Sequence, residues 1–312
     1  MSDAASAQLR LGPLADAEML TGPLPRRRAL LERVSASGLD HVFMADHVSF
    51  HTGFGMDGLV QATTVAALEA TLRAYVGVYL LALRHPVTVA RQIATLCESA
   101  PGRLVLGIGV GGEDRHEIEI CGVDPTTRGR RTDEALAALR GLLSGRPTTF
   151  RGEFYEFEEA WILPAPEPPV PIVIGGRADA ALRRAARFGD GWLGVWCSAR
   201  RYAEVLRHVS AEAERAGRAG ACREHGLQLW IGVDDDRQRA RERLAEAMQG
   251  MYRMPFERFE RYSPCGTPAE IADFFAPYVE AGCTTFNVMS VSASSERSID
   301  AVAEIKERLR AL

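Results

Sequence analysis

The sequence predicts an α/β fold: one (β/α)8 TIM barrel with an insertion near residues 148–171. Short apolar runs and helical segments alternate about eight times along 312 residues, and this alternation is typical of βαβ units with a parallel sheet. Glycine-rich or ionisable loops follow several of the apolar runs, as they do at the carboxyl ends of barrel strands. The length fits one barrel or two ordinary domains. The regular alternation favours a single domain over residues 1–312 rather than a doubly wound sheet.

Four strand–helix pairs are expected before the insertion. The run Val42–Ala45 is apolar throughout, which suits a strand covered on both faces. Gly38 ends the helix before it, and Pro86 suits the first turn of a later helix. We expect strands at Gln8–Leu14, Val42–Ala45, Tyr75–Leu83 and Leu104–Ile108, and helices at Pro25–Ser37, Gly58–Leu72, Val87–Ser99 and Arg128–Leu143.

The segment Thr148–Pro171 interrupts this rhythm. It alternates aromatic and charged residues and then runs through five prolines, a pattern that indicates an inserted hairpin. After it we expect strands at Ile172–Ile174, Gly191–Trp196, Leu227–Val233 and Thr284–Met289, and helices at Ala178–Arg187, Tyr202–Ala216, Arg237–Met251, from Thr267-Pro268 onward and at Ile299–Leu309. The segment Met254–Pro264 fits no regular element, and we expect it to be a mobile lid.

Composition excludes several classes of function. A formal net charge of −4 gives no general attraction to nucleic acid or to an anionic membrane. The six cysteines form no CxxC pair, so neither a zinc ribbon nor a disulfide framework is indicated. No apolar run reaches about 18 residues, and the amino-terminal segment has no signal-peptide core. We therefore expect a soluble cytoplasmic protein that acts on a small molecule.

Metal-dependent and hydrolytic chemistry are not indicated either. His116 stands among carboxylates, but no second histidine lies at ligand spacing, so we predict no metal site. The patterns GxSxG, P-loop and HExxH do not occur, which disfavours hydrolases and kinases.

The first candidate site is the pair Asp46 and His47, which follows the buried run Val42–Ala45. Catalytic groups of parallel α/β folds lie at the carboxyl ends of strands. His47 could exchange a proton near neutral pH, and Asp46 could orient it or bind a polar ligand edge. In the alternative, Asp46 caps the following turn and His47 is an ordinary loop residue. The barrel fold favours the catalytic interpretation, because this loop then lies on the catalytic face.

Two glycine-rich loops are further candidates. Gly107–Gly112 has the glycine density of a loop whose backbone N–H groups approach a cofactor. It is not the spaced GxGxxG of a dinucleotide fold, so a tight turn remains the alternative. Gly175-Gly176-Arg177 precedes a helix, and a helix amino terminus with a nearby arginine suits a phosphate.

Five segments taken together resemble the luciferase-like monooxygenase superfamily, in particular its branch that uses the deazaflavin coenzyme F420. They are GLDHVFMADH, YVGVYLLALRHPVTVARQIATL, PGRLVLGIGVGGEDRHE, GVDPTTRGRRTDEAL and PIVIGGRADAALRRAARFGDGW, and they follow one another in the family's order between Gly38 and Trp192. The resemblance implies a luciferase-like (β/α)8 barrel with an insertion, a flavin or deazaflavin over the strand ends, and hydride transfer.

The resemblance also implies roles for individual residues. His47 is the expected acid/base, and Glu18 matches a carboxylate that faces substrate in the sugar-phosphate dehydrogenases. The expected cofactor-binding residues are Asp46, Tyr79, Leu80, Val110, Gly111, Gly175, Gly176 and Arg177. A non-prolyl cis peptide is expected between Tyr79 and Leu80, where it would support the ring.

Three positions depart from the family pattern. His51 stands where the deazaflavin dehydrogenases often carry a tryptophan. The second acid of a relative falls on Gly112 or, with a one-residue slip, on Glu113. No lysine follows the GDGW segment, so Arg200 or Arg201 would have to bind a phosphate.

The leading hypothesis is an oxidoreductase that passes a hydride between the C5 atom of coenzyme F420 and a small organic substrate. The alternative is an FMN-dependent two-component monooxygenase fed by a separate flavin reductase. A third hypothesis is a non-catalytic flavin-binding relative. The polyanionic tail of F420 is favoured by an excess of arginine at Arg177, Arg183, Arg184, Arg200 and Arg201. Because family members commonly dimerise, a homodimer is expected.

Overall fold

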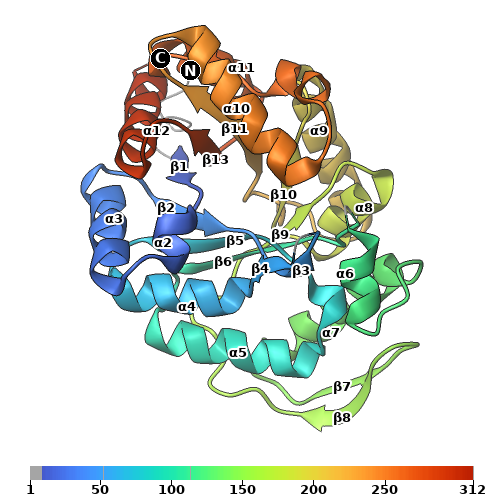
Figure 1. Ribbon diagram of the computed structural model, residues 1–312. Coiled ribbons are helices and arrows are strands. Elements are labelled where there is room, and N and C mark those ends of the chain that lie inside the picture. Colours follow the sequence, from blue (N-terminus) through green and yellow to red (C-terminus); the bar gives the residue numbers. More distant parts are fainter. Residues whose placement is uncertain (1–8, 52, 113, 312) are drawn as a thin grey trace.

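Eight parallel strands form a closed barrel in the computed structural model of the protein (Figure 1), which describes residues 9–51, 53–112 and 114–311. The barrel closes where Leu14 pairs with Phe43 and the N–H of Ala15 donates to the Phe43 carbonyl at 2.8 Å. The barrel strands are β1 (Arg10–Pro13), β2 (His41–Met44), β5 (Arg73–Tyr79), β6 (Leu104–Ile108), β9 (Ile172–Gly175), β10 (Gly191–Val195), β11 (Gly226–Val233) and β13 (Thr285–Val291). The predicted (β/α)8 class is confirmed.

Helices cover the outside of the barrel because each presents an apolar face to the strands. In α9 the buried residues Tyr202, Val205, Val209 and Ala213 recur at helical spacing. The predicted start of α11 at Thr267-Pro268 is confirmed by a capping box between Thr267 and Glu270. The outer helices are α3 (Leu24–Ala36), α4 (Gly58–Leu68), α5 (Pro86–Ser99), α7 (Arg128–Leu142), α8 (Asp179–Phe188), α9 (Ala199–Arg215), α10 (Arg237–Tyr252), α11 (Pro268–Glu280) and α12 (Ser295–Arg310).

The apolar residues of each strand divide between two cores. On β2, Phe43 packs inside the barrel with Tyr75 of β5, whereas Val42 and Met44 pack outward among the helices. Alternate side chains of a strand point to opposite faces, so a strand with two apolar environments must be apolar throughout. This explains the continuous apolar run that the sequence shows there.

The insertion and several short elements lie outside this pattern of strands and outer helices. The predicted hairpin is confirmed as β7 (Thr148–Arg151) and β8 (Glu156–Ala160), which lies outside the barrel beside α5 (Figure 1). The sequence did not predict the elements that surround the carboxyl ends of the first four strands. These are α2 (Ala17–Thr21), β3 (His47–Phe50), β4 (Phe54–Met56) and α6 (Arg115–Ile120).

The third barrel strand differs from its prediction in length and geometry. It ends at Tyr79, and a 3-10 helix, η1 (Leu81–Leu83), follows it. The predicted cis peptide between Tyr79 and Leu80 is wrong, because the non-prolyl cis bond joins Gly77 and Val78. A Cβ at residue 77 would stand 2.9 Å from Oε1 of Gln228, so a side chain there would displace that amide. The pairing register of β5 with β6 shifts over this stretch.

The segment Met254–Pro264 is packed rather than open. It forms two 3-10 turns, η2 (Phe256–Arg258) and η3 (Glu260–Tyr262), and it leads to β12 (Cys265–Gly266), which pairs with β11. Phe256 and Phe259 are buried against the inner core. The segment thus has regular turns that the sequence analysis did not predict, and its role as a mobile lid stays a prediction. Within the described ranges, none of the helices combines the length and apolarity that crossing a membrane requires.

Candidate active site

A cavity of about 480 Å³ lies at the carboxyl ends of the barrel strands. This is the end of the fold on which TIM-barrel enzymes carry their active sites. Nearly every barrel strand contributes a residue at or just beyond its end. These residues are Leu14, Asp46, Val78, Gly109, Gly175, Val195 and Met289.

Asp46 lies on the cavity wall and is held by four hydrogen-bond donors. The Arg84 guanidinium binds both of its oxygens, at 2.7 and 2.9 Å, and the N–H groups of Gly58 and Leu80 donate to it at 2.8 and 2.9 Å. Burial raises the pKa of Asp46, and Arg84 with the two N–H groups opposes this shift. A bidentate guanidinium contact favours the carboxylate form. Asp46 therefore fixes the chain at the start of α4 and at the end of β5.

His47 begins β3 and lies on the same cavity wall. Its Nδ1 is 3.1 Å from Oε2 of Glu117, and its ring lies 4.2 Å from the ring of Phe50. A carboxylate accepts only, so Nδ1 carries the proton in this contact and Nε2 is the ring atom that can exchange one. His47 is thus oriented by a carboxylate, as general acid/base histidines are.

Glu117 was missed as a functional residue by the sequence analysis. It lies on α6 with a side chain that is only 3% exposed, and it also accepts hydrogen bonds from the N–H groups of Val48 and Ser49 at 2.7 and 3.1 Å. One helical turn earlier, Asp114 accepts from the N–H of His51 at 2.7 Å. The available signal was this spacing, since acids three residues apart share one face of a helix.

The two glycine loops meet on one side chain, that of Val78. A Cβ on Gly109 would stand 2.3 Å from Cγ2 of Val78, and one on Gly175 would stand 2.8 Å from its Cγ1. Gly111 and Gly176 have φ of 67° and 128°, in the region that favours glycine. The structure therefore brings the loops after β6 and β9 together around the inward-facing end of β5.

Six of the predicted cofactor-binding residues line the cavity: Asp46, Leu80, Val110, Gly111, Gly175 and Gly176. Two others do not. The ring of Tyr79 is buried beneath the Arg84 guanidinium, 4.2 Å from it. Arg177 is exposed, and its guanidinium lies 5.4 Å from the ring of Trp196, which does line the cavity.

The remaining candidates lie apart from the cavity. Glu18 is not among its lining residues. It binds Arg26 at 2.9 Å and accepts a hydrogen bond from Ser295. Gly112 packs near the Arg128 guanidinium, and Glu113, like Gln8 at the start of the first predicted strand, lies outside the described residues. Within the described ranges, no group of three acidic, cysteine or histidine side chains could hold a metal ion.

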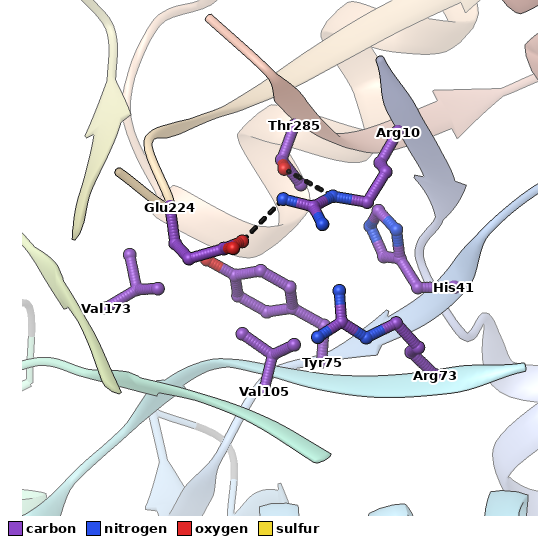
Figure 2. Close-up of a pocket in the computed structure, with 8 residues that line it drawn as sticks. All are labelled: Arg10, His41, Arg73, Tyr75, Val105, Val173, Glu224 and Thr285. Atoms are coloured by element: carbon purple, nitrogen blue, oxygen red, sulfur yellow. Dashed lines mark hydrogen bonds and ion pairs between the residues drawn. The ribbon is translucent and has the colours of Figure 1, made fainter. Parts of the chain in front are cut away.

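A second, much smaller cavity of about 10 Å³ lies at the opposite end of the barrel (Figure 2). Arg10 bridges Glu224 and Thr285 there, and His41 lies beside them. Burial lowers the pKa of His41 to about 4, so its ring is neutral at pH 7 and its Nε2 contacts Oδ1 of Asn287 at 2.8 Å. These groups come from the amino ends of strands, where residues of TIM barrels serve stability.

Comparison with known proteins agrees with this geometry. The model of the luciferase-like monooxygenase family matches residues 7–264, and the chain belongs to this family. An F420-dependent glucose-6-phosphate dehydrogenase of Beutenbergia cavernae is 31% identical over 97% of this chain and 98% of its own. An uncharacterised protein of Mycobacterium tuberculosis is 31% identical over 72% of this chain and 78% of its own.

Solved structures share the fold. An F420-dependent secondary alcohol dehydrogenase, solved with an F420-acetone adduct, superposes with a TM-score of 0.83 at 21% identity, over 95% of this chain and 98% of that one. A riboflavin lyase, solved with modified FMN and riboflavin, superposes with a TM-score of 0.79 at 16% identity, over 97% of this chain and 92% of that one. The barrel is therefore of the luciferase-like type.

Proposed function

We propose that the protein is a coenzyme F420-dependent oxidoreductase that transfers a hydride between the deazaflavin C5 and a small organic substrate, with His47 as acid/base. The observation that carries this proposal is the Glu117-oriented His47 on the wall of a cavity that two glycine loops also line. The relative named F420-dependent glucose-6-phosphate dehydrogenase, which matches nearly the whole chain, supports the choice of cofactor.

The residues of the cavity fit a flat, extended cofactor of this kind. Gly109, Val110 and Gly111 form one edge of the cavity, and Gly175 with Gly176 forms a second edge beside it. Glycine allows the backbone to approach a ring closely and to offer its N–H groups. Val78 stands between the two loops and would support the ring from below.

The chain's own residues would perform the acid/base step. Coenzyme F420, when bound, supplies a carbon that accepts or returns a hydride. Glu117 holds His47 by Nδ1, which leaves Nε2 to take the proton of a substrate hydroxyl or to return it to a carbonyl oxygen. The apolar side chains of the cavity would exclude water from this exchange.

The arginines that the sequence analysis considered for binding the anionic tail of F420 differ in whether their guanidinium groups are already paired. Arg184 is buried and binds Asp133 at 2.6 Å. Arg200 and Arg201 both pair with Glu204. Arg177, exposed beside the cavity-lining Trp196, remains the best placed cation for a phosphate.

An FMN-dependent monooxygenase with a separate flavin reductase is the second candidate. It is supported by the same cavity and by the fold shared with a structure that holds modified FMN. A homodimer, expected from the family resemblance, and a cytoplasmic location, expected from the composition of the sequence, complete the proposal as predictions.

A parallel fluorescence titration of the cofactor-free protein with F420 and with FMN tests the proposal. We expect F420 to bind with a Kd at least about ten-fold lower, a difference of about 1.4 kcal/mol. Preferential binding of FMN would overturn the assignment of the cofactor.

A second test addresses His47. The His47→Gln variant should lose activity and keep its affinity for F420, whereas the matched variant of the exposed His116, His116→Gln, should match the unaltered protein. Unchanged turnover by His47→Gln would refute its role as acid/base and would favour a flavin-binding protein without this chemistry.

A further inference from the structure

We infer that the substrate is an uncharged and largely apolar alcohol, or its carbonyl counterpart, rather than a sugar phosphate. This inference rests on the proposed function and names the substrate class of the same site. It departs from the name of the relatives, which are described as glucose-6-phosphate dehydrogenases.

The described residues that line the cavity include no permanently charged cation. The ionisable side chains among its described lining residues are Asp16, Asp46, His47 and Tyr252, and none of those residues is a lysine or an arginine. A buried phosphate dianion needs cations or a ring of N–H donors to replace its water. Arg84, the nearest cation to Asp46, already binds both oxygens of that carboxylate. The described lining residues therefore offer a phosphate group no cation.

The carboxylates of Asp16 and Glu18 already accept hydrogen bonds from other groups of the protein. Asp16 caps α2 by accepting from the N–H of Met19 at 3.0 Å, and its other oxygen accepts from the hydroxyl of Ser295. Glu18, the residue that resembles a substrate-facing acid of the sugar-phosphate enzymes, binds Arg26 and the same serine hydroxyl. Part of the accepting capacity of the cavity-lining Asp16 is therefore already used, and Glu18 is not among the lining residues.

Apolar side chains form another wall of the cavity. Leu14 and Leu20 come from the end of β1 and from α2, and Met251 comes from the end of α10. Trp196 and Met289 complete this wall. A polyol bound here would leave buried hydroxyl groups without partners, and each such group weakens binding. An alkyl or aryl group would gain from the same surface.

His47 supplies a polar contact for the oxygen atom on the reacting carbon of the substrate. Oxidation of an alcohol removes a hydride from the carbinol carbon, which the cofactor accepts, and a proton from the hydroxyl, which His47 accepts. The amide of Gln228, at the floor of the cavity, has an Oε1 without a hydrogen-bond partner. This Oε1 can accept from one substrate hydroxyl, whereas a carbonyl oxygen would accept from the Nε2–H of protonated His47. Apolar substituents can lie on either side.

Turnover of a substrate panel by the F420-loaded protein tests the inference. The panel contains secondary alcohols of increasing chain length, glucose 6-phosphate, and glucose as an uncharged polyol. We expect kcat/KM to rise with alkyl length and to exceed that of both sugars by about a hundred-fold, since unpaired buried polar groups discriminate strongly. Equal or better use of glucose 6-phosphate would overturn the inference.

A cofactor-independent measurement separates this inference from the proposed function. Acetophenone should quench the fluorescence of Trp196 in the cofactor-free protein, and glucose 6-phosphate at the same concentration should not. The Trp196→Phe variant identifies the signal. If F420 fails to bind but acetophenone still quenches, the proposed cofactor is wrong and the apolar substrate class stands. Quenching by glucose 6-phosphate alone would overturn the substrate class.

A matched pair of variants tests whether the apolar wall of the cavity contacts the substrate. Leu20→Arg places a cation among the lining residues, whereas Leu24→Arg makes the same change at an exposed position outside the cavity. Leu20→Arg should lower kcat/KM for the preferred alcohol by about ten-fold or more, because a desolvated charge then opposes binding. Leu24→Arg should leave it unchanged. Equal activity of the two variants would contradict the assignment of this wall to the substrate.

Discussion

The substitution Glu117→Gln isolates the charge that orients the acid/base histidine. The amide oxygen can still accept from the N–H of Val48, now at 2.7 Å from Oε1, so β3 should keep its position. The amide NH2 then replaces Oε2 and cannot accept from Nδ1 of His47, which keeps only the longer contact of 3.3 Å with the uncharged oxygen at the Oε1 position. A hydrogen bond to a charged group contributes about 1.5–3 kcal/mol and a neutral one about 0.5–1.5 kcal/mol. The difference of about 1.5 kcal/mol corresponds to about a ten-fold loss in kcat.

Steady-state turnover, F420 titration and thermal unfolding should be measured together. We expect kcat to fall and KM and cofactor affinity to change by less than about three-fold, because Glu117 is not among the cavity-lining residues. The control Glu119→Gln changes an exposed acid of the same helix, which pairs with Arg115. If Glu117→Gln kept kcat within two-fold while His47→Gln lost it, Glu117 would not act through His47.

Three further predictions concern the surroundings of the site. Arg84→Met should destabilise the protein by about 3–5 kcal/mol in denaturant unfolding, because it leaves the fully buried Asp46 carboxylate without its cation. Stability should fall as the pH drops from about 6.5 to 4, because the buried His41 has a pKa of about 4 and the unfolded chain takes up the proton first. A pKa lowered from 6.5 to about 4 corresponds to a loss of about 3 kcal/mol of stability over this pH range, and His41→Gln should flatten the pH profile. Gly109→Ala should weaken F420 binding and cost about 1–3 kcal/mol of stability, because its Cβ would overlap Val78.

Each of these predictions has a control or a refuting result. Arg115→Met removes an exposed ion pair and should change stability by less than about 0.5 kcal/mol; a similar loss at both arginines would mean that burial is not the cause. An unfolding profile of His41→Gln as steep as that of the unaltered protein would exclude His41 as the titrating group. Gly250→Ala lies in a helix with open space around it and should stabilise by about 0.5–1 kcal/mol. Unchanged affinity in Gly109→Ala would remove the first glycine loop from the cofactor site.

The barrel could be predicted from the sequence because its signals are local. Most barrel strands contain a short apolar run and most outer helices have an apolar face, so the alternation of the two patterns defines the order of the elements. Boundaries that depend on other segments were less accessible. β5 was predicted to run to Leu83, because the apolar run continues there, yet it ends at Tyr79. There the N–H of Leu80 binds the distant Asp46 instead of a neighbouring strand.

In the candidate site, too, local sequence signals identified some residues, whereas residues whose role depends on distant contacts were missed. The motif-bearing loops, with Asp46, His47 and the glycines, were found because their residue types are unusual at strand ends. Glu117 was missed because its role depends on a contact with a residue 70 positions earlier. Glu18 matched the family pattern by position, but the neighbouring Arg26 and the distant Ser295 bind its carboxylate. Pairings between distant segments, rather than composition, decide which acids face the cavity.

Val78 occupies a space that three glycines on two other strands leave empty. Gly107, Gly109 and Gly175 would each bring a Cβ within 3.3 Å of this one side chain. The four positions therefore share one packing volume. A larger side chain at one of them must be matched by a smaller one at another. Val78→Ala should make room for an alanine at position 109, so the floor of the cavity could be reshaped by paired exchanges that no single substitution would permit. For redesign of the pocket, these four positions are best treated together.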